Sequence, residues 1–188
     1  DYVKFIAFAE DMIAKNGSGI VAMITNNGYL DNPTFRGMRW QLRKTFDMVY
    51  VLDLHGNAKK NEVSPDGSKD QNVFDIMQGV SILVAVKTDG HEDQLAEIKH
   101  AELYGARQDK FIRLGNDVVW ESLQCDDKNH YFVPKNMVGQ AEYEAGIVVN
   151  ELFLTSVTGI VTMGDNFIIS EKKEVISDRI NKLIDGGY

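Results

Sequence analysis

The sequence predicts an α/β fold, because helical and strand-like segments alternate along its first half. Apolar side chains recur at helical spacing near the amino terminus, and apolar runs of strand length follow at residues 20–24 and 48–54. The order helix, strand, helix, strand predicts a parallel pair of strands with helices on both faces. A third run at residues 79–86 has no helical segment before it, so it can lie antiparallel to the second strand.

The first predicted helix begins beside Asp1 and carries one apolar face. Its apolar residues lie one, three or four positions apart: Tyr2, Phe5, Ile6, Ala9, Met12 and Ile13. Gly17 suits the left-handed cap that ends such a helix. The run from Ile20 to Ile24 contains no polar residue, which is typical of a strand buried on both faces.

Turn-forming residues at 26–28 and 31–33 separate this strand from a second helix, expected from about Thr34 to Thr45. The second strand is expected from Met48 to Leu54, and the polar loop from His55 to Asn72 leads to the third strand. A loop of this length inside a domain is usually functional or disordered.

The loop is expected to be mobile without DNA, because Ala58 and Val63 are its only apolar residues before Val73. Phe74 follows directly, where the chain returns to the sheet. Two interpretations of Phe74 remain open: its ring caps the core, or it lies at the mouth of a site.

Beyond the third strand the pattern is less regular. Residues 91–103 are expected to form a short exposed segment, and helical spacing recurs at 141–154 and 171–184. We predict two regions: residues 1–105, and residues 106–188 with mixed α+β structure.

The net charge of −8 argues against strong independent DNA binding, because such binders usually carry a basic face. The net charge does not exclude a local basic strip on the second helix and in the long loop. Its candidate DNA-backbone contacts are Arg36, Arg39, Arg43, Lys59 and Lys60. The alternative is that these side chains are ordinary solvated charges.

Several site classes are excluded by composition and spacing. Cys125 is the only cysteine, so no intramolecular disulfide or multi-cysteine zinc site is expected, and a cytoplasmic setting fits. The four histidines show no ligand spacing, so no metal is assigned. No apolar run is long enough to span a membrane. No glycine-rich loop follows a strand, and no catalytic residue can be assigned.

Five short motifs stand out within residues 1–87. They are Asp1-Tyr2-Val3-Lys4-Phe5-Ile6, GIVAMITNNGYL (19–30), Thr34-Phe35-Arg36-Gly37-Met38-Arg39, VLDLHGN (51–57), and Asn72-Val73-Phe74-Asp75-Ile76 with Gly79-Val80. Together they resemble the gamma-class N6-adenine DNA methyltransferases, of the type IIG and type ISP restriction–modification kind. Weaker similarity continues at residues 104–107, Trp120, residues 156–162 and Asp165.

The resemblance implies that residues 1–105 form the C-terminal half of a Rossmann-like methyltransferase sheet, with the antiparallel seventh strand between the fifth and sixth. It implies that residues 106–188 are a linker and the start of the target-recognition region. The motifs that hold S-adenosylmethionine and the target amino group would precede Asp1. We therefore expect an internal fragment that is inactive alone. Phe5 matches the aromatic that packs on the cofactor's adenine ring, although core packing is the alternative. Phe74 matches the aromatic that contacts the extruded target adenine.

The implied cofactor of the full-length parent is S-adenosyl-L-methionine. The implied partners are double-stranded DNA, the upstream half of the methyltransferase domain, and a nuclease or helicase domain in the same polypeptide, with no membrane. Two other interpretations stay open. One is a non-catalytic DNA-specificity or subunit-docking module; the other is an unrelated doubly wound nucleotide-binding domain, which would need a glycine-rich turn after its first strand.

Overall fold

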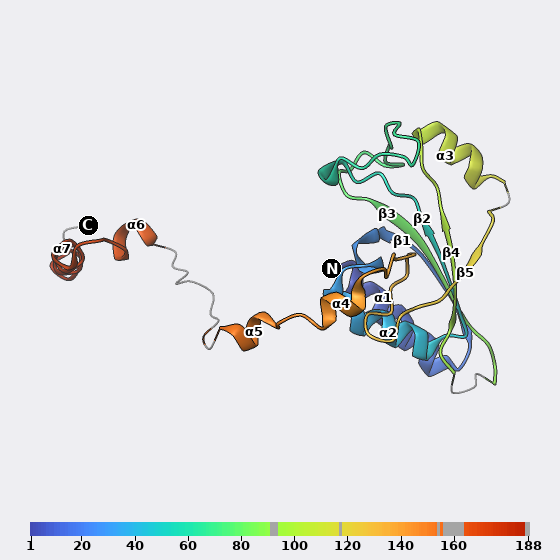
Figure 1. The fold of residues 1–188 in the computed structure, drawn as a ribbon, viewed down its shortest axis with the longest axis horizontal. Helices are drawn as coiled ribbons and strands as arrows, with labels where there is room; N and C mark the ends of the chain where they lie inside the picture. Colours follow the sequence, from blue (N-terminus) through green and yellow to red (C-terminus); the bar gives the residue numbers. More distant parts are fainter. Residues whose placement is uncertain (91–93, 117, 154, 156–163, 187–188) are drawn as a thin grey trace. The chain divides into compact units, whose positions relative to one another are not determined.

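The computed structural model describes residues 1–90, 94–116, 118–153, 155 and 164–186 (Figure 1). The chain divides into two compact units, Asp1–Asn136 and Met137–Tyr188. None of the helices formed by the described residues is long and apolar enough to cross a lipid bilayer.

The first unit is built on a mixed five-stranded sheet in the order β1-β3-β2-β4-β5. Its strands are β1 (Gly19–Asn26), β2 (Met48–Asp53), β3 (Val80–Lys87), β4 (Glu97–Glu102) and β5 (Glu121–Leu123). Strand β3 pairs antiparallel with both β1 and β2, with Leu83 opposite Met23 on one side and Val51 on the other. The predicted insertion of an antiparallel third strand between two others is therefore confirmed.

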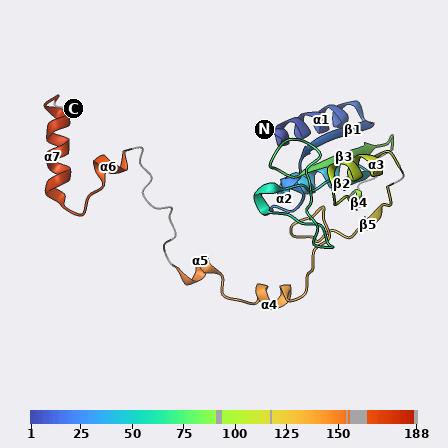
Figure 2. The same ribbon diagram turned by 90° about the horizontal axis from the view of Figure 1, so that it is seen from above.

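Apolar side chains fill both faces of this sheet. Helices α1 (Tyr2–Asn16) and α2 (Arg36–Thr45) cover one face (Figure 2), where Ile6 and Leu42 pack in one cluster with Val51. The next residue of β2, Leu52, belongs to a second cluster, to which α3 (Arg107–Leu114) contributes Leu114. Successive residues of β2 thus reach opposite faces, as strand geometry requires.

Helix α1 ends as the sequence predicts. Gly17 has φ 90°, and its N–H donates to the carbonyl of Ile13. Glycine adopts this left-handed conformation without the steric penalty that a side chain would bring. The cap turns the chain directly into β1.

Strand β1 lies at the edge of the sheet and pairs with β3 alone among the described strands. Val21 is buried, but Ile20 and Ile24 are 65% and 55% exposed. The prediction that this strand is buried on both faces is therefore wrong for this chain. The apolar run does not have a second covering layer or a second neighbouring strand among the residues described.

The predicted exposed segment at residues 91–103 is also wrong where the structure describes it. Strand β4 pairs parallel with β2 along its whole length, and Ile98, His100 and Ala101 are buried. The sequence of β4 is EIKHAE, which lacks a continuous apolar run. Strand β4 is buried because it pairs with β2 on one side and β5 on the other. The spacing of apolar residues within a strand does not show which strands will pair with it.

The first unit extends past the predicted division between residues 105 and 106. Strand β5 adds to β4, and Phe132 is fully buried in the first core cluster, with its N–H donating to the carbonyl of Leu30. The structural division therefore falls at Asn136. The assignment of later residues to target recognition stays a prediction.

The second unit contains short helices and one longer helix. They are α4 (Gln140–Glu144), α5 (Val149–Leu152), α6 (Asp165–Ile168) and α7 (Lys173–Ile184). Two short helices replace the single one predicted near 141–154, whereas α7 matches the prediction for 171–184. Arg179 of α7 donates to the carbonyls of Phe167 and Ile169. The weak motif at 156–162 lies outside the described residues.

Candidate functional site

A polar cleft of about 330 Å³ lies where β1, β2 and β4 end. Its lining comes from the carboxyl ends of all three strands, from the segments that follow β1 and β2, and from a segment after β5. The lining residues are Asn26, Asn27, Gly28, Leu30, Asp31, Asn32, Asp53, His55, Asn57, Lys60, Glu62, Glu102, Val133 and Pro134. Ligands of open α/β sheets bind outside the carboxyl ends of the strands. This cleft is therefore the first candidate site.

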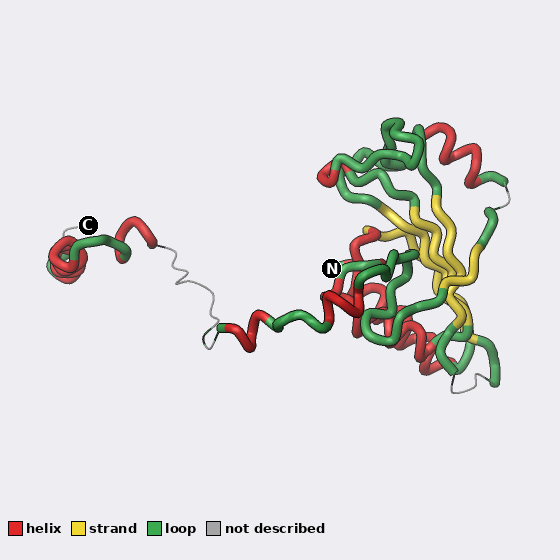
Figure 3. Tube along the Cα trace, viewed as in Figure 1, coloured by secondary structure: helices red, strands yellow, loops and turns green. Residues whose placement is uncertain are grey.

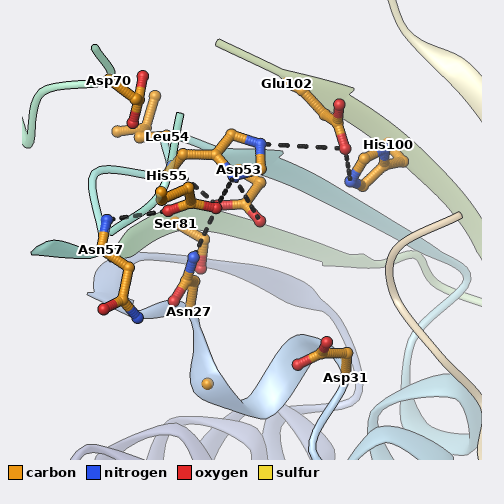
Figure 4. Close-up of polar contacts among 12 residues, drawn as sticks. Asn27, Asp31, Asp53, Leu54, His55, Asn57, Asp70, Ser81, His100 and Glu102 are labelled. Atoms are coloured by element: carbon orange, nitrogen blue, oxygen red, sulfur yellow. Dashed lines mark hydrogen bonds and ion pairs between the residues drawn. The ribbon is translucent and has the colours of Figure 1, made fainter. Parts of the chain in front are cut away.

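Asp53, the last residue of β2, organises the floor of the cleft (Figure 4). One carboxylate oxygen, Oδ1, accepts hydrogen bonds from the Asn27 side chain and from the His55 backbone N–H, both at 3.0 Å. Asn27 begins η1 (Asn27–Leu30), directly after β1. Asp53 thus links the ends of two strands that β3 separates in the sheet.

His55 is the most constrained group in the cleft. Its φ is 52°, its Nδ1 lies 2.9 Å from Glu62 Oε1, and its ring stacks on Tyr104 with centroids 3.7 Å apart. Burial acts to lower the pKa of His55, but the hydrogen bond to Glu62 and the charges of Asp53, Glu62 and Glu102 outweigh it. The net result is a raised pKa, which favours the imidazolium form.

A second histidine, His100, faces the Glu102 carboxylate, which also lies near His55. The Nε2 atoms of His55 and His100 each lie 3.9 Å from Glu102 Oε1, and both are buried without a hydrogen-bond partner among the described residues (Figure 4). Burial lowers the pKa of His100 and raises the pKa of Glu102. Three titratable groups therefore converge on one point. The pKa shifts favour the charged form of His55 and the neutral forms of His100 and Glu102.

This arrangement can hold or exchange protons and can hydrogen-bond a small polar group. It does not form a metal centre: within the described part of the chain, no group of three or more histidine, cysteine, aspartate or glutamate residues could hold a metal ion. The sequence did not point to His55, Glu62, His100 and Glu102 as a cluster. The available signal was a charged residue at the end of each of two strands, with a histidine two positions after one of them.

We expect the stability lost in His55→Gln to be larger at low pH than at high pH. A histidine whose folded-state pKa is raised stabilises the fold fully below its unfolded value of about 6.5, and this contribution is lost as the pH rises through the folded-state pKa. Thermal unfolding of wild type and variant at about pH 6 and about pH 8.5 checks this.

His100→Gln is the matched contrast, because the folded-state pKa of His100 is lowered. Its contribution is present above the unfolded value and is lost as the pH falls through the lowered pKa. A melting-temperature gap for His55→Gln that widens with rising pH would contradict the assignment.

A second, open groove of about 570 Å³ contains Phe74. The Phe74 ring is 43% exposed, and Ile76 and Met77 beside it are also exposed. Gly56, Ala58, Asn72 and Arg107 complete much of its wall. Phe74 is therefore not a buried core residue, and the interpretation that it merely caps the core is disfavoured. Its role in contacting a base stays a prediction.

Asn72 and Gly56 shape the backbone that carries Phe74. The Asn72 amide donates to the carbonyls of Gly56 and Gln78, and its side-chain oxygen accepts from the Phe74 N–H at 2.8 Å. Gly56 has φ 81°, and a Cβ there would lie 2.4 Å from the Asn72 Cα. This close approach requires glycine.

The loop from His55 to Asn72 is held by polar contacts that the prediction of mobility did not take into account, and its mobility without DNA stays a prediction. Lys110 of α3 donates to the carbonyls of Leu54 and Gln71, and its Nζ lies 2.8 Å from Asp70 Oδ1. Figure 3 shows the loop between β2 and β3 beside helix α3. Counting apolar residues missed these anchors because they are buried charges and backbone carbonyls.

The predicted basic strip does not form as a single exposed face. Arg36 is exposed, but Arg39 is fully buried and donates to the carbonyls of Tyr29, Asn32 and Asn129. Arg39 therefore cannot contact DNA phosphates, and that prediction is wrong. The guanidinium donates to backbone carbonyls of η1, of the turn that follows η1, and of the segment that leads to Phe132.

The remaining basic candidates differ in exposure. Arg43 is half-buried, and its Nη1 lies 2.9 Å from Nδ1 of His130. Lys59 and Lys60 belong to η3 (Ala58–Lys60), are exposed, and precede the left-handed Asn61. DNA contact by Arg36, Arg43, Lys59 and Lys60 stays a prediction.

The cofactor candidate Phe5 lies on α1 with 64% of its surface exposed. Phe8 on the same helix is 66% exposed. Core packing within this chain therefore does not explain Phe5. The prediction that it packs on a cofactor ring stays a prediction.

Solved structures that share this fold include the cryo-EM structure of a DrdV–DNA complex, with a TM-score of 0.61 and 23% identity over 98% of this chain and 20% of that chain. They also include the ATP-dependent Type ISP restriction-modification enzyme LlaBIII bound to DNA, with a TM-score of 0.66 and 22% identity over 98% of this chain and 13% of that chain. A nuclease-deletion mutant of the Type ISP restriction-modification enzyme LlaGI in complex with a DNA substrate mimic has a TM-score of 0.63 and 22% identity over 96% of this chain and 18% of that chain. At these identities the likeness shows the fold alone.

The chain spans a fifth or less of the length of each of these structures. No protein-family model matches the sequence, and neither does any curated protein.

Proposed function

We propose that this chain is part of a site-specific adenine-N6 DNA methyltransferase of a restriction–modification system, which transfers a methyl group from S-adenosylmethionine to adenine in DNA. The observation that carries the proposal is the exposed Phe74 ring, placed just before an antiparallel strand that lies between two parallel ones. An aromatic face in an open groove can stack on a base taken out of the duplex.

The solved structures that share the fold support this proposal. Two are named as Type ISP restriction-modification enzymes, and all three are complexes with DNA or a DNA mimic. A chain that aligns along 96–98% of its length with such enzymes is consistent with a role in DNA modification.

The exposed face of α1 and β1 supports a partner in the same polypeptide. Phe5 and Phe8 on α1 and Ile20 and Ile24 on β1 are all more than half exposed, and β1 is an edge strand. An uncharged edge strand of eight residues is a template for pairing with another strand. The partner that fits is the upstream half of the methyltransferase domain.

Of the described residues, Phe5 is our candidate for contact with S-adenosylmethionine, the methyl donor when bound. An exposed phenyl face suits packing against the adenine ring of such a cofactor. The residues that would hold the cofactor's sugar and methionine belong to the partner half. The chain alone is therefore expected to transfer no methyl group and to bind DNA weakly and without sequence preference, given its charge of −8.

Methylation by the full-length parent tests the proposal. The parent is incubated with tritiated S-adenosylmethionine and duplex DNA, and the DNA is digested to nucleosides. We expect the label in N6-methyl-2′-deoxyadenosine, at a defined sequence, and none when this chain alone replaces the parent. Label in cytosine, or no label although the parent binds DNA specifically, would contradict the proposal. The second outcome would favour the non-catalytic specificity or docking module.

A further inference from the structure

Arg107, the first residue of α3, donates hydrogen bonds to the backbone that carries Phe74. The Arg107 guanidinium donates from Nε to the Asn72 carbonyl at 2.7 Å and from Nη2 to the Phe74 carbonyl at 2.9 Å. The same Nη2 lies 2.7 Å from Asp75 Oδ1. One planar cation thus contacts three residues of this segment, Asn72, Phe74 and Asp75.

Further bonds hold the two segments in register. The Arg107 N–H donates to the Gln71 side chain at 2.9 Å, and the Gln71 N–H donates to the Gly105 carbonyl at 3.0 Å. The Gly105 N–H donates to Asp70 Oδ1 at 2.8 Å. Residues 70–75 are therefore bonded to residues 105–107 at several points, although the two segments are more than thirty positions apart.

The contact to Asp75 contributes little, because that carboxylate is 91% exposed and solvent screens the pair. The bonds to the two carbonyls act differently. They flank the Phe74 peptide and limit rotation of the backbone from which the half-exposed ring projects. A guanidinium suits this task, since its donors lie in a fixed fork.

We propose that Arg107 is a positioning residue, which holds the Phe74 ring in the orientation that receives an extruded base. The proposal rests on the proposed function and deepens it by naming what orients the stacking residue. Arg107 acts through the carbonyls of Asn72 and Phe74 and not by touching the base. An aromatic ring that is already held in its bound orientation loses less conformational entropy when the base binds.

The hydrogen bonds from Arg107 to the carbonyls of Asn72 and Phe74 form a clamp on this segment. Hydrogen exchange on this chain tests the clamp independently of any reaction. Arg107→Ala is expected to speed exchange of the amides in residues 72–75 about tenfold or more, because the segment opens more often. Arg113→Ala is the matched control: it lies on the same helix, is exposed, and leaves those amides unchanged. Equal protection in the Arg107→Ala and wild-type chains would overturn the clamp, whatever the parent enzyme does.

A double-mutant cycle in the full-length parent tests the orientation of Phe74. Single-turnover methylation by Arg107→Ala is expected to fall about tenfold, and the same change in a Phe74→Ala background should cost less than about twofold. Losses that simply multiply would overturn the proposal.

Arg107→Lys separates positioning from charge. Lysine keeps the positive charge but lacks the fork, so it is expected to recover little of the methylation rate. Full recovery with lysine would show a phosphate contact instead and would overturn the positioning role. A parent without adenine methylation would refute the proposed function, while the exchange experiment would still decide whether the clamp exists.

Discussion

Replacing Phe74 with alanine is expected to slow methylation by the full-length parent about ten- to hundredfold while leaving its folding stability nearly unchanged. Stacking on an aromatic side chain stabilises an unstacked base by about 1–3 kcal/mol, and that stabilisation is lost with the ring. A buried phenylalanine would instead cost about 3–5 kcal/mol of folding free energy on truncation. Because the ring is 43% exposed, the structure favours the smaller folding cost.

The measurement pairs single-turnover methylation with thermal unfolding on the same variants. Phe74→Tyr and Phe74→Trp are the controls, since each keeps a π-face and should retain much of the rate. A large loss of melting temperature with near-normal turnover in the folded fraction of Phe74→Ala would refute base stacking. It would leave Phe74 as a residue needed only for folding.

Replacing Lys110 with methionine is expected to destabilise the first unit by about 3–5 kcal/mol. The Lys110 and Asp70 side chains are both fully buried, and the ammonium also donates to the carbonyls of Leu54 and Gln71 at 2.7 Å. Methionine matches the length of the lysine stem but leaves the Asp70 carboxylate buried without a counter-charge. Removing one partner of a buried pair is costly for this reason.

Chemical denaturation of this chain measures the effect. The double variant Lys110→Met with Asp70→Asn should recover part of the loss, because the amide carries no charge while it can still accept from the Gly105 N–H. Lys69→Met is the control for an adjacent exposed lysine and should change the unfolding free energy little. A loss below about 1 kcal/mol for Lys110→Met would show that the pair is unimportant to the fold.

The central fold could be predicted from sequence wherever local pattern and connection length suffice. Helical spacing indicated α1, and apolar runs indicated the three strands that became β1, β2 and β3. The lack of a helix before β3 indicated its antiparallel direction, which the pairing confirms. These features depend on side chains within one element or on the length between two, so the sequence carries them directly.

Phe74 could be singled out as well, because an aromatic at the end of a long polar loop is a local feature. What surrounds it could not. The hydrogen bonds from Arg107 to residues 72–75, and those from the buried Lys110 to the loop after β2, join segments that are far apart in the chain.

Sequence alone therefore determined the alternation of elements, the inserted strand and the residue at the mouth of the groove. Only the tertiary structure decided that β4 is buried, that Arg39 serves backbone carbonyls and not DNA, and that His55 and His100 face Glu102. The physical reason is that burial of a charged or polar side chain depends on the partners that reach it. Arg39 finds Asn129 ninety positions away, and no local pattern records such a partner.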